Sequence, residues 1–148
     1  MNPTRILPDL QCSLPVQDIR QEVNGNLILI GVLNGIVVPQ LPITLARLLF
    51  FSRWTAGVGR FKETTRIVAP DQVTTIAKLD ANFELPDVTA HAMNVTALGN
   101  ITFNAAGVYF VEVLVDDVMK IRYPMHVVVV PPPQTPPQKQ PPPPSTTS

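Results

Sequence analysis

The sequence predicts an all-β protein, a single β-sandwich followed by a disordered proline-rich tail, with a closed barrel as the alternative to the sandwich. Short apolar or alternating segments recur along the chain, separated by turn signals at intervals of about eight to twelve residues, and none has the periodicity of a long helix. Nine of the 17 prolines lie in residues 131–148. The composition therefore divides the chain into an N-terminal arm (1–10), a β-domain (11–130) and the tail (131–148).

The first strands are predicted around two Asn-Gly pairs. Asn24-Gly25 suits a tight hairpin because both residues tolerate positive φ, and Asn34-Gly35 marks a second turn. Between them, Asn26–Leu33 is apolar at both parities, so we expect a central strand covered on both sides. Ile36–Val38 follows as a short strand, which the next prolines end because proline cannot donate to a ladder.

Thr44–Trp54 fits a strand or a helix by apolar spacing alone. Its aromatic content and the β-rich surroundings favour a strand. In a strand, alternation gives an inward face of Ala46, Leu48, Phe50 and Trp54 and a second face of Arg47, Leu49, Phe51 and Arg53.

The remaining segments continue the β pattern. Further strands are expected at Phe61–Val68, Val73–Leu79, Val88–Leu98 and Ile101–Phe103, with Gly99-Asn100 as a turn between the last two. The C-terminal third alternates most regularly, with one face of Tyr109, Val111, Val113 and Val115. Asp116-Asp117 predicts a tight connection, and Pro124 predicts a bulge or an edge in the last strand, which His126–Val130 closes.

Charge and cysteine content bound the partners and the compartment. Eleven basic residues balance eleven acidic ones, so no net field draws the chain to nucleic acid or anionic lipid. Cys12 is the only cysteine, which excludes an intrachain disulfide and favours a reducing compartment. No apolar run has the length of a signal peptide or a membrane span. We expect a soluble cytoplasmic protein without membrane association, or a virion component if the gene is phage-borne.

No catalytic or metal-binding pattern emerges from the polar residues. The acids Asp71, Asp87, Asp116 and Asp117 sit at turns, where Asp bonds its own backbone, and no acid stands out as embedded among apolar residues. His91 and His126 have no further ligands at metal-site spacing, and Cys12 has no histidine motif near it. The chain is therefore expected to be no enzyme and to hold no cofactor or metal.

Two surfaces remain as binding candidates. The first is the strand face of Arg47, Leu49, Phe51 and Arg53. If this face meets solvent, it presents an apolar centre between two guanidiniums, as an interface does. If both faces of the strand are covered, the same residues belong to the core. We predict a non-catalytic structural or protein-interaction module. Its partner is expected to be another protein or a second copy of the chain. The alternative is a β-domain that binds nucleic acid or a small ligand through the basic stretch Arg47–Arg66.

Two segments resemble known families. Ile101–Asp117, with its Gly-x-Tyr before an alternating strand and an acidic turn, resembles the penultimate hairpin of immunoglobulin-like bacterial sandwiches. The resemblance implies an immunoglobulin-like β-sandwich in which Tyr109 is a corner tyrosine, buried and bonded to nearby backbone. Asp18–Val32 is similar to the opening of an uncharacterised family of small bacterial proteins, although Asn26 stands where that family has Lys. That likeness spans Gln11–Val130 and implies a bacterial or phage origin, without an activity.

Overall fold

A computed structural model describes residues 4–132, which form nine strands and no helix. The strands are β1 (Asp9–Gln21), β2 (Leu27–Val32), β3 (Ile36–Val38), β4 (Ile43–Thr55), β5 (Gly59–Val68), β6 (Thr75–Leu85), β7 (His91–Phe103), β8 (Gly107–Val115) and β9 (Val118–Val129). The all-β prediction is confirmed. The predicted tail lies outside the described residues from position 133 onward.

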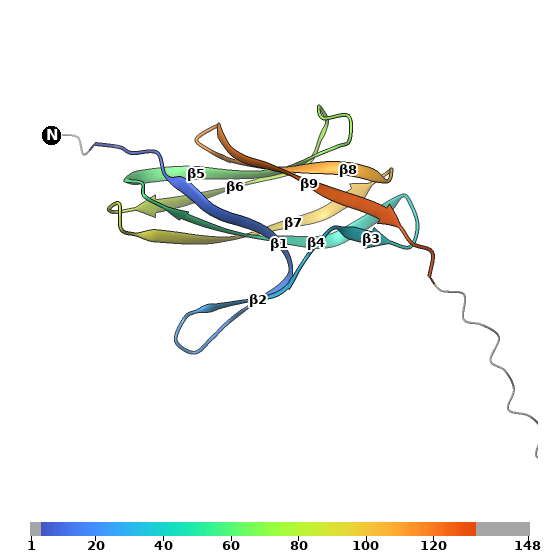
Figure 1. The fold of residues 1–148 in the computed structure, drawn as a ribbon, viewed down its shortest axis with the longest axis horizontal. Coiled ribbons are helices and arrows are strands. Elements are labelled where there is room, and N and C mark those ends of the chain that lie inside the picture. Colours follow the sequence, from blue (N-terminus) through green and yellow to red (C-terminus); the bar gives the residue numbers. More distant parts are fainter. Residues whose placement is uncertain (1–3, 133–148) are drawn as a thin grey trace, which may run out of the picture.

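The strands form two sheets that lie face to face as two layers (Figure 1). One sheet has the order β2-β1-β4-β7, and the other has the order β3-β9-β8-β5-β6. Neighbouring strands are antiparallel, except that β3 pairs in parallel with β9. The segment that could have been a helix is strand β4 in the middle of the first sheet.

The core between the sheets follows the predicted alternation, except that Ala46, predicted to point inward, is exposed. In β4, Leu48, Phe50 and Trp54 are buried in this core, and the apolar face of β8 meets them from the other sheet. The Trp54 ring stacks on Phe83 at a centroid distance of 5.3 Å. Each fully buried large apolar side chain stabilises the fold by about 1.5–3 kcal/mol relative to an exposed one.

Tyr109 lies near the start of β8. Its ring is buried, and its hydroxyl donates a 2.7 Å hydrogen bond to the carbonyl of Ala105. Phe103 contacts the same ring edge-on, with centroids 5.1 Å apart. The predicted buried tyrosine with a nearby backbone acceptor is confirmed.

The Asp116-Asp117 turn joins β8 to β9 as expected. Both residues have positive φ, 45° and 68°, which a tight hairpin of this hand requires. The Asp116 carboxylate also accepts a 2.9 Å hydrogen bond from the backbone N–H of Lys62 and pairs with Arg5. The turn is thereby fixed to β5 and to the segment before β1.

Two predicted features are wrong. The run Asn26–Leu33 is not a covered central strand, because β2 is the edge of its sheet. Gly99-Asn100 is no turn, since β7 continues through both residues and Gly99 pairs with Arg47. Asn100 has a φ of 52° within the strand, so its turn propensity produces a local irregularity instead of a reversal.

Candidate interaction surface

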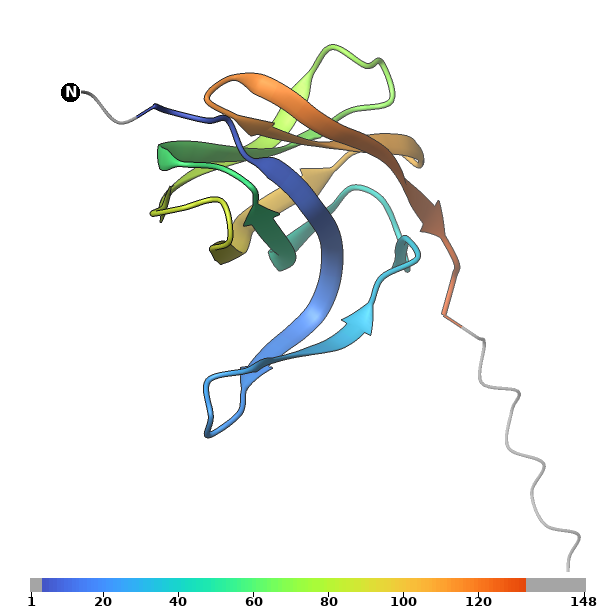
Figure 2. The same ribbon diagram turned by 60° about the vertical axis from the view of Figure 1, so that its left-hand side comes forward.

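The hairpin of β1 and β2 leaves the body of the protein. The first part of β1 pairs with β4 from Asp9 to Val16, and the second part pairs with β2 from Val16 to Gln21. Beyond Val16 the hairpin is therefore a two-stranded ribbon. It projects on the side of its sheet that faces away from the other sheet (Figures 1 and 2).

The ribbon exposes apolar side chains. On β2, Ile28, Ile30 and Val32 are 42%, 37% and 51% exposed. Opposite them on β1 lie Asp18 and Arg20, which pair with each other at 3.4 Å. An exposed ion pair of this kind adds at most about 1 kcal/mol, so the hairpin depends little on charge.

β2 is also an unprotected edge. Within the described residues no strand pairs with its second side, and Leu27–Val32 contains no charged residue and no proline. The edges of the other sheet are defended: β6 carries Lys78, Asp80 and Glu84, and β3 is three residues long. The opposite edge of the first sheet, β7, runs beside β6. β2 is thus the edge most open to another chain.

The outer face of the first sheet continues this apolar surface. Strand register places Leu14, Phe51 and Val95 in one row and Val16, Leu49 and Ala97 in the next. Phe51 and Leu49 are each 7% exposed, and neither belongs to the core between the sheets. These residues form a second apolar layer on the outer face of the first sheet.

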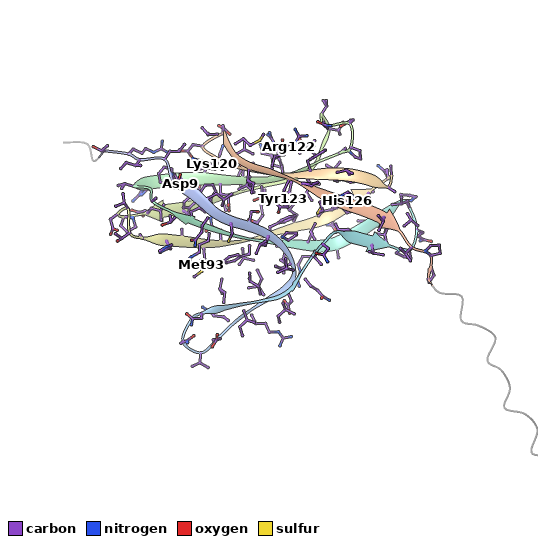
Figure 3. The ribbon with its side chains drawn as sticks, viewed as in Figure 1. Asp9, Met93, Lys120, Arg122, Tyr123 and His126 are labelled. Atoms are coloured by element: carbon purple, nitrogen blue, oxygen red, sulfur yellow. The ribbon has the colours of Figure 1, made fainter. Side chains whose placement is uncertain are left out.

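Exposed residues flank that layer. Met93 and Val95 on β7 are 49% and 45% exposed. Register puts Met93 beside Arg53 on the same face, and Figure 3 shows Met93 on the side of the sheet toward the hairpin. We define the outer apolar surface as the exposed side chains Ile28, Ile30, Val32, Met93 and Val95.

The four residues predicted as an interface do share one face. Arg47 is exposed, Arg53 is half-buried, and Leu49 and Phe51 lie buried between them. The exposed apolar area belongs to neighbouring strands that the sequence reasoning did not select. The Leu-Ile-Leu-Ile run after an Asn-Gly turn is the signal for this element, but its apolar residues at both parities predict a strand covered on both sides.

The basic stretch Arg47–Arg66 is not one surface. Arg47 and Arg53 lie on the outer face of the first sheet, whereas the cations of β5 lie on the other sheet. Each cation of β5 pairs with an acid: Arg60 with Glu84 at 3.7 Å, Lys62 with Asp117 at 3.4 Å and Arg66 with Glu112 at 2.6 Å. The stretch therefore presents no continuous positive field.

One acid is embedded in the core, contrary to expectation. Glu63 has no exposed surface. Its carboxylate accepts hydrogen bonds from Trp54 Nε1 at 2.7 Å and from Asn94 Nδ2 at 3.2 Å. Parity gave the signal, because Glu63 lies between Phe61 and Ile67 at inward positions. Enclosed in this way, the carboxylate satisfies buried donors and has no access to a substrate.

The acids at turns serve their own loops. The Thr74 hydroxyl and the amides of Thr74 and Val73 hydrogen-bond to Asp71 and lower the pKa of its carboxyl. The Thr89 hydroxyl and amide likewise lower the pKa of Asp87. In the part of the chain that the structure describes, no three ligand side chains gather as a metal site would require.

The comparisons with known proteins give a family without a function. A model of a family of unknown function (DUF6941) matches residues 15–128. The match contains the hairpin from Pro15 onward and nearly all the later strands. No curated protein matches the chain significantly. Over residues 4–132 there is no helix long and apolar enough to cross a membrane.

Proposed function

Since the chain belongs to this family of unknown function, we propose its role from its own surface: a non-catalytic protein-interaction module that binds through the outer apolar surface. The observation that carries the proposal is the projecting hairpin, which exposes Ile28, Ile30 and Val32. Single exposed apolar residues are common, but clusters of them mark binding sites. The cluster lies on the hairpin of β1 and β2, and the part of this hairpin beyond Val16 contributes no residue to the core between the sheets.

The immunoglobulin-like relationship belongs to the same proposal. In that pattern, strands A-B-E face strands G-F-C-C′, and a corner tyrosine begins strand F. The order β1-β4-β7 corresponds to the first set and β9-β8-β5-β6 to the second, with Tyr109 near the start of β8. Within residues 4–132 the pattern's D strand has no counterpart. On this assignment β2 and β3 are additions, and β2 is the addition that projects.

The chemistry of β2 favours a polypeptide partner over a lipid surface. A free strand edge presents backbone N–H and C=O groups, which an added strand can satisfy and a hydrocarbon cannot. Apolar side chains on the same element then supply the contact area. A bacterial or phage origin and a cytoplasmic or virion location remain part of the proposal; the single cysteine supports only a reducing compartment such as the cytoplasm.

Site-specific photo-crosslinking in the cells that produce the protein tests the proposal. A photoreactive residue at Met93 or Val95 should give covalent adducts with a protein. The control position is Lys78, which is exposed on the outer face of the other sheet. Adducts at Lys78 as strong as those at Met93 and Val95, or no adducts at either, would sink the proposal.

A further inference from the structure

We propose that a second copy of this chain adds to β2 edge to edge, so that two copies share one continuous sheet. The inference rests on the proposed function, because it names the partner of the same surface. Three observations carry it: the free edge of β2, the pattern of its side chains, and the charges around it.

The backbone of β2 is available for pairing. In an antiparallel ladder, alternate residues direct their N–H and C=O groups to opposite sides. β1 therefore uses only half of the groups of β2, and the other half point away from the sheet. Strands with such an edge usually carry lysine, proline or a bulge. The segment Leu27–Ile30 carries none of these.

The side chains of β2 are self-complementary. A twofold axis at Leu29 places Ile28 of each copy opposite Ile30 of the other. Ile28 and Ile30 share one face, and Leu27 and Leu29 share the opposite face. The joint between the two copies would then be apolar on each face, with β-branched Ile28–Ile30 pairs on one face and Leu29 beside its own copy on the other. One axis also keeps the outer apolar surfaces of both copies on the same side.

Charge does not oppose the pairing. The chain has a formal net charge of zero, so two copies do not repel each other. Asp18 and Arg20 pair within their own hairpin, one strand away from the seam. Every cross-seam neighbour in Leu27–Ile30 is apolar, and no like charges meet.

The geometry limits the assembly to two copies. Gly31 has a φ of 66°, a departure from extended backbone within β2, which continues to Val32. This positive φ would strain any other residue at position 31, whose Cβ would also lie 3.0 Å from the Cβ of Gln17. A twofold contact is isologous, and each copy uses its β2 edge once. The pairing therefore closes as a dimer and does not extend into a filament.

Two measurements on the full chain test the inference. Sedimentation should give twice the chain mass of 16.2 kDa at high concentration. Ile28→Lys with Ile30→Lys should abolish the dimer, because charges at an edge block pairing. The matched control is Val37→Lys with Val128→Lys, which adds equal charge at exposed positions of the other sheet and should leave the dimer intact.

A disulfide trap reports the seam directly. In a Cys12→Ser background, Leu29→Cys should form an interchain disulfide under mild oxidation, because the axis places both copies of this position together. Val37→Cys should not. The inference is overturned by a monomeric parent chain without trapping at position 29, or by a dimer that survives both lysines. A monomer that still gives adducts at Val95 overturns the second copy but leaves the interaction module standing; a monomer without adducts overturns both.

Discussion

The Tyr109 hydroxyl is a single group whose contribution can be isolated. It donates to the Ala105 carbonyl at 2.7 Å, and its ring is buried against Phe103. Tyr109→Phe should lower the free energy of unfolding by about 1–2 kcal/mol, because it leaves that acceptor without its partner. Tyr109→Ala should lower it by about 3–5 kcal/mol through the cavity. Urea unfolding measures both, and a neutral Phe variant would contradict the corner role.

Tyr123 provides a pH-dependent stability term. Burial raises the pKa of its hydroxyl from 10.0 to about 12, while the hydrogen bond with Ser13 lowers it slightly. Because the folded pKa is the higher one, the full stability is present below the unfolded pKa and falls as pH rises through the folded value. The loss between about pH 10 and 12 should reach at most about 2–3 kcal/mol.

Replacing this group removes the dependence. Tyr123→Phe should show a smaller decline of the free energy of unfolding over that alkaline window than the parent. The two proteins differ only in this hydroxyl, so the difference between their slopes isolates Tyr123. Equal slopes in urea unfolding across the window would contradict the raised pKa.

At the scale of strands, β4 has two buried faces of different origin. Its inward face enters the core between the sheets, and Leu49 and Phe51 enter the outer apolar layer. Leu49→Ser with Phe51→Ser should unfold the domain, because each truncation of a buried large side chain costs about 2–5 kcal/mol and a domain has only about 5–15 kcal/mol.

Thermal unfolding followed by circular dichroism measures the effect. Met93→Ser with Val95→Ser is the matched control, since those side chains share the face but are half exposed, and it should remain folded. A folded Leu49→Ser, Phe51→Ser variant with the stability of the parent would show that the outer layer contributes little.

Strand positions could be predicted because they are local properties. Alternation placed Leu48, Phe50 and Trp54 inward correctly, and the two Asp residues after β8 marked their turn. The place of β2 could not be predicted in this way. Apolar residues at both parities fit a central strand, and they fit an edge whose partner is another chain equally well. Local pattern does not specify neighbours.

The same limit applies to the candidate site. The shared face of Leu49 and Phe51 followed from their spacing, but their burial depends on Val16 and on the residues of β7 in the adjacent rows. The burial of Glu63 was not predicted, and its partners Trp54 and Asn94 come from the facing sheet. Contacts between sheets are set by the whole fold, which no short window of sequence contains.

At the scale of the whole molecule, the net charge of zero reflects local pairing of basic with acidic side chains on the second sheet. The cations of β5 each meet an acid of β6, of β8 or of the turn that follows β8, as Arg66 does with Glu112 at 2.6 Å. Glu112 also lies 3.7 Å from Arg122. Local neutralisation of this kind stabilises the second sheet and leaves no extended positive stripe along a strand.

This charge distribution makes a prediction about nucleic acid. A single strand of nucleic acid needs a positive groove with accessible aromatic rings. Here Arg47 and Arg53 lie on one sheet, the cations of β5 lie on the other, and Trp54 and Phe51 are buried. We therefore expect a labelled oligonucleotide to bind no more tightly than the non-specific range of about 10⁻⁴–10⁻⁶ M. Fluorescence anisotropy at about 50 and 200 mM salt measures the affinity.

Submicromolar binding that weakens steeply over this salt range and is lost on Arg47→Ala with Arg53→Ala would overturn the expectation and restore the nucleic-acid function. Lys78→Ala with Lys120→Ala removes the same charge from the other sheet and serves as the control.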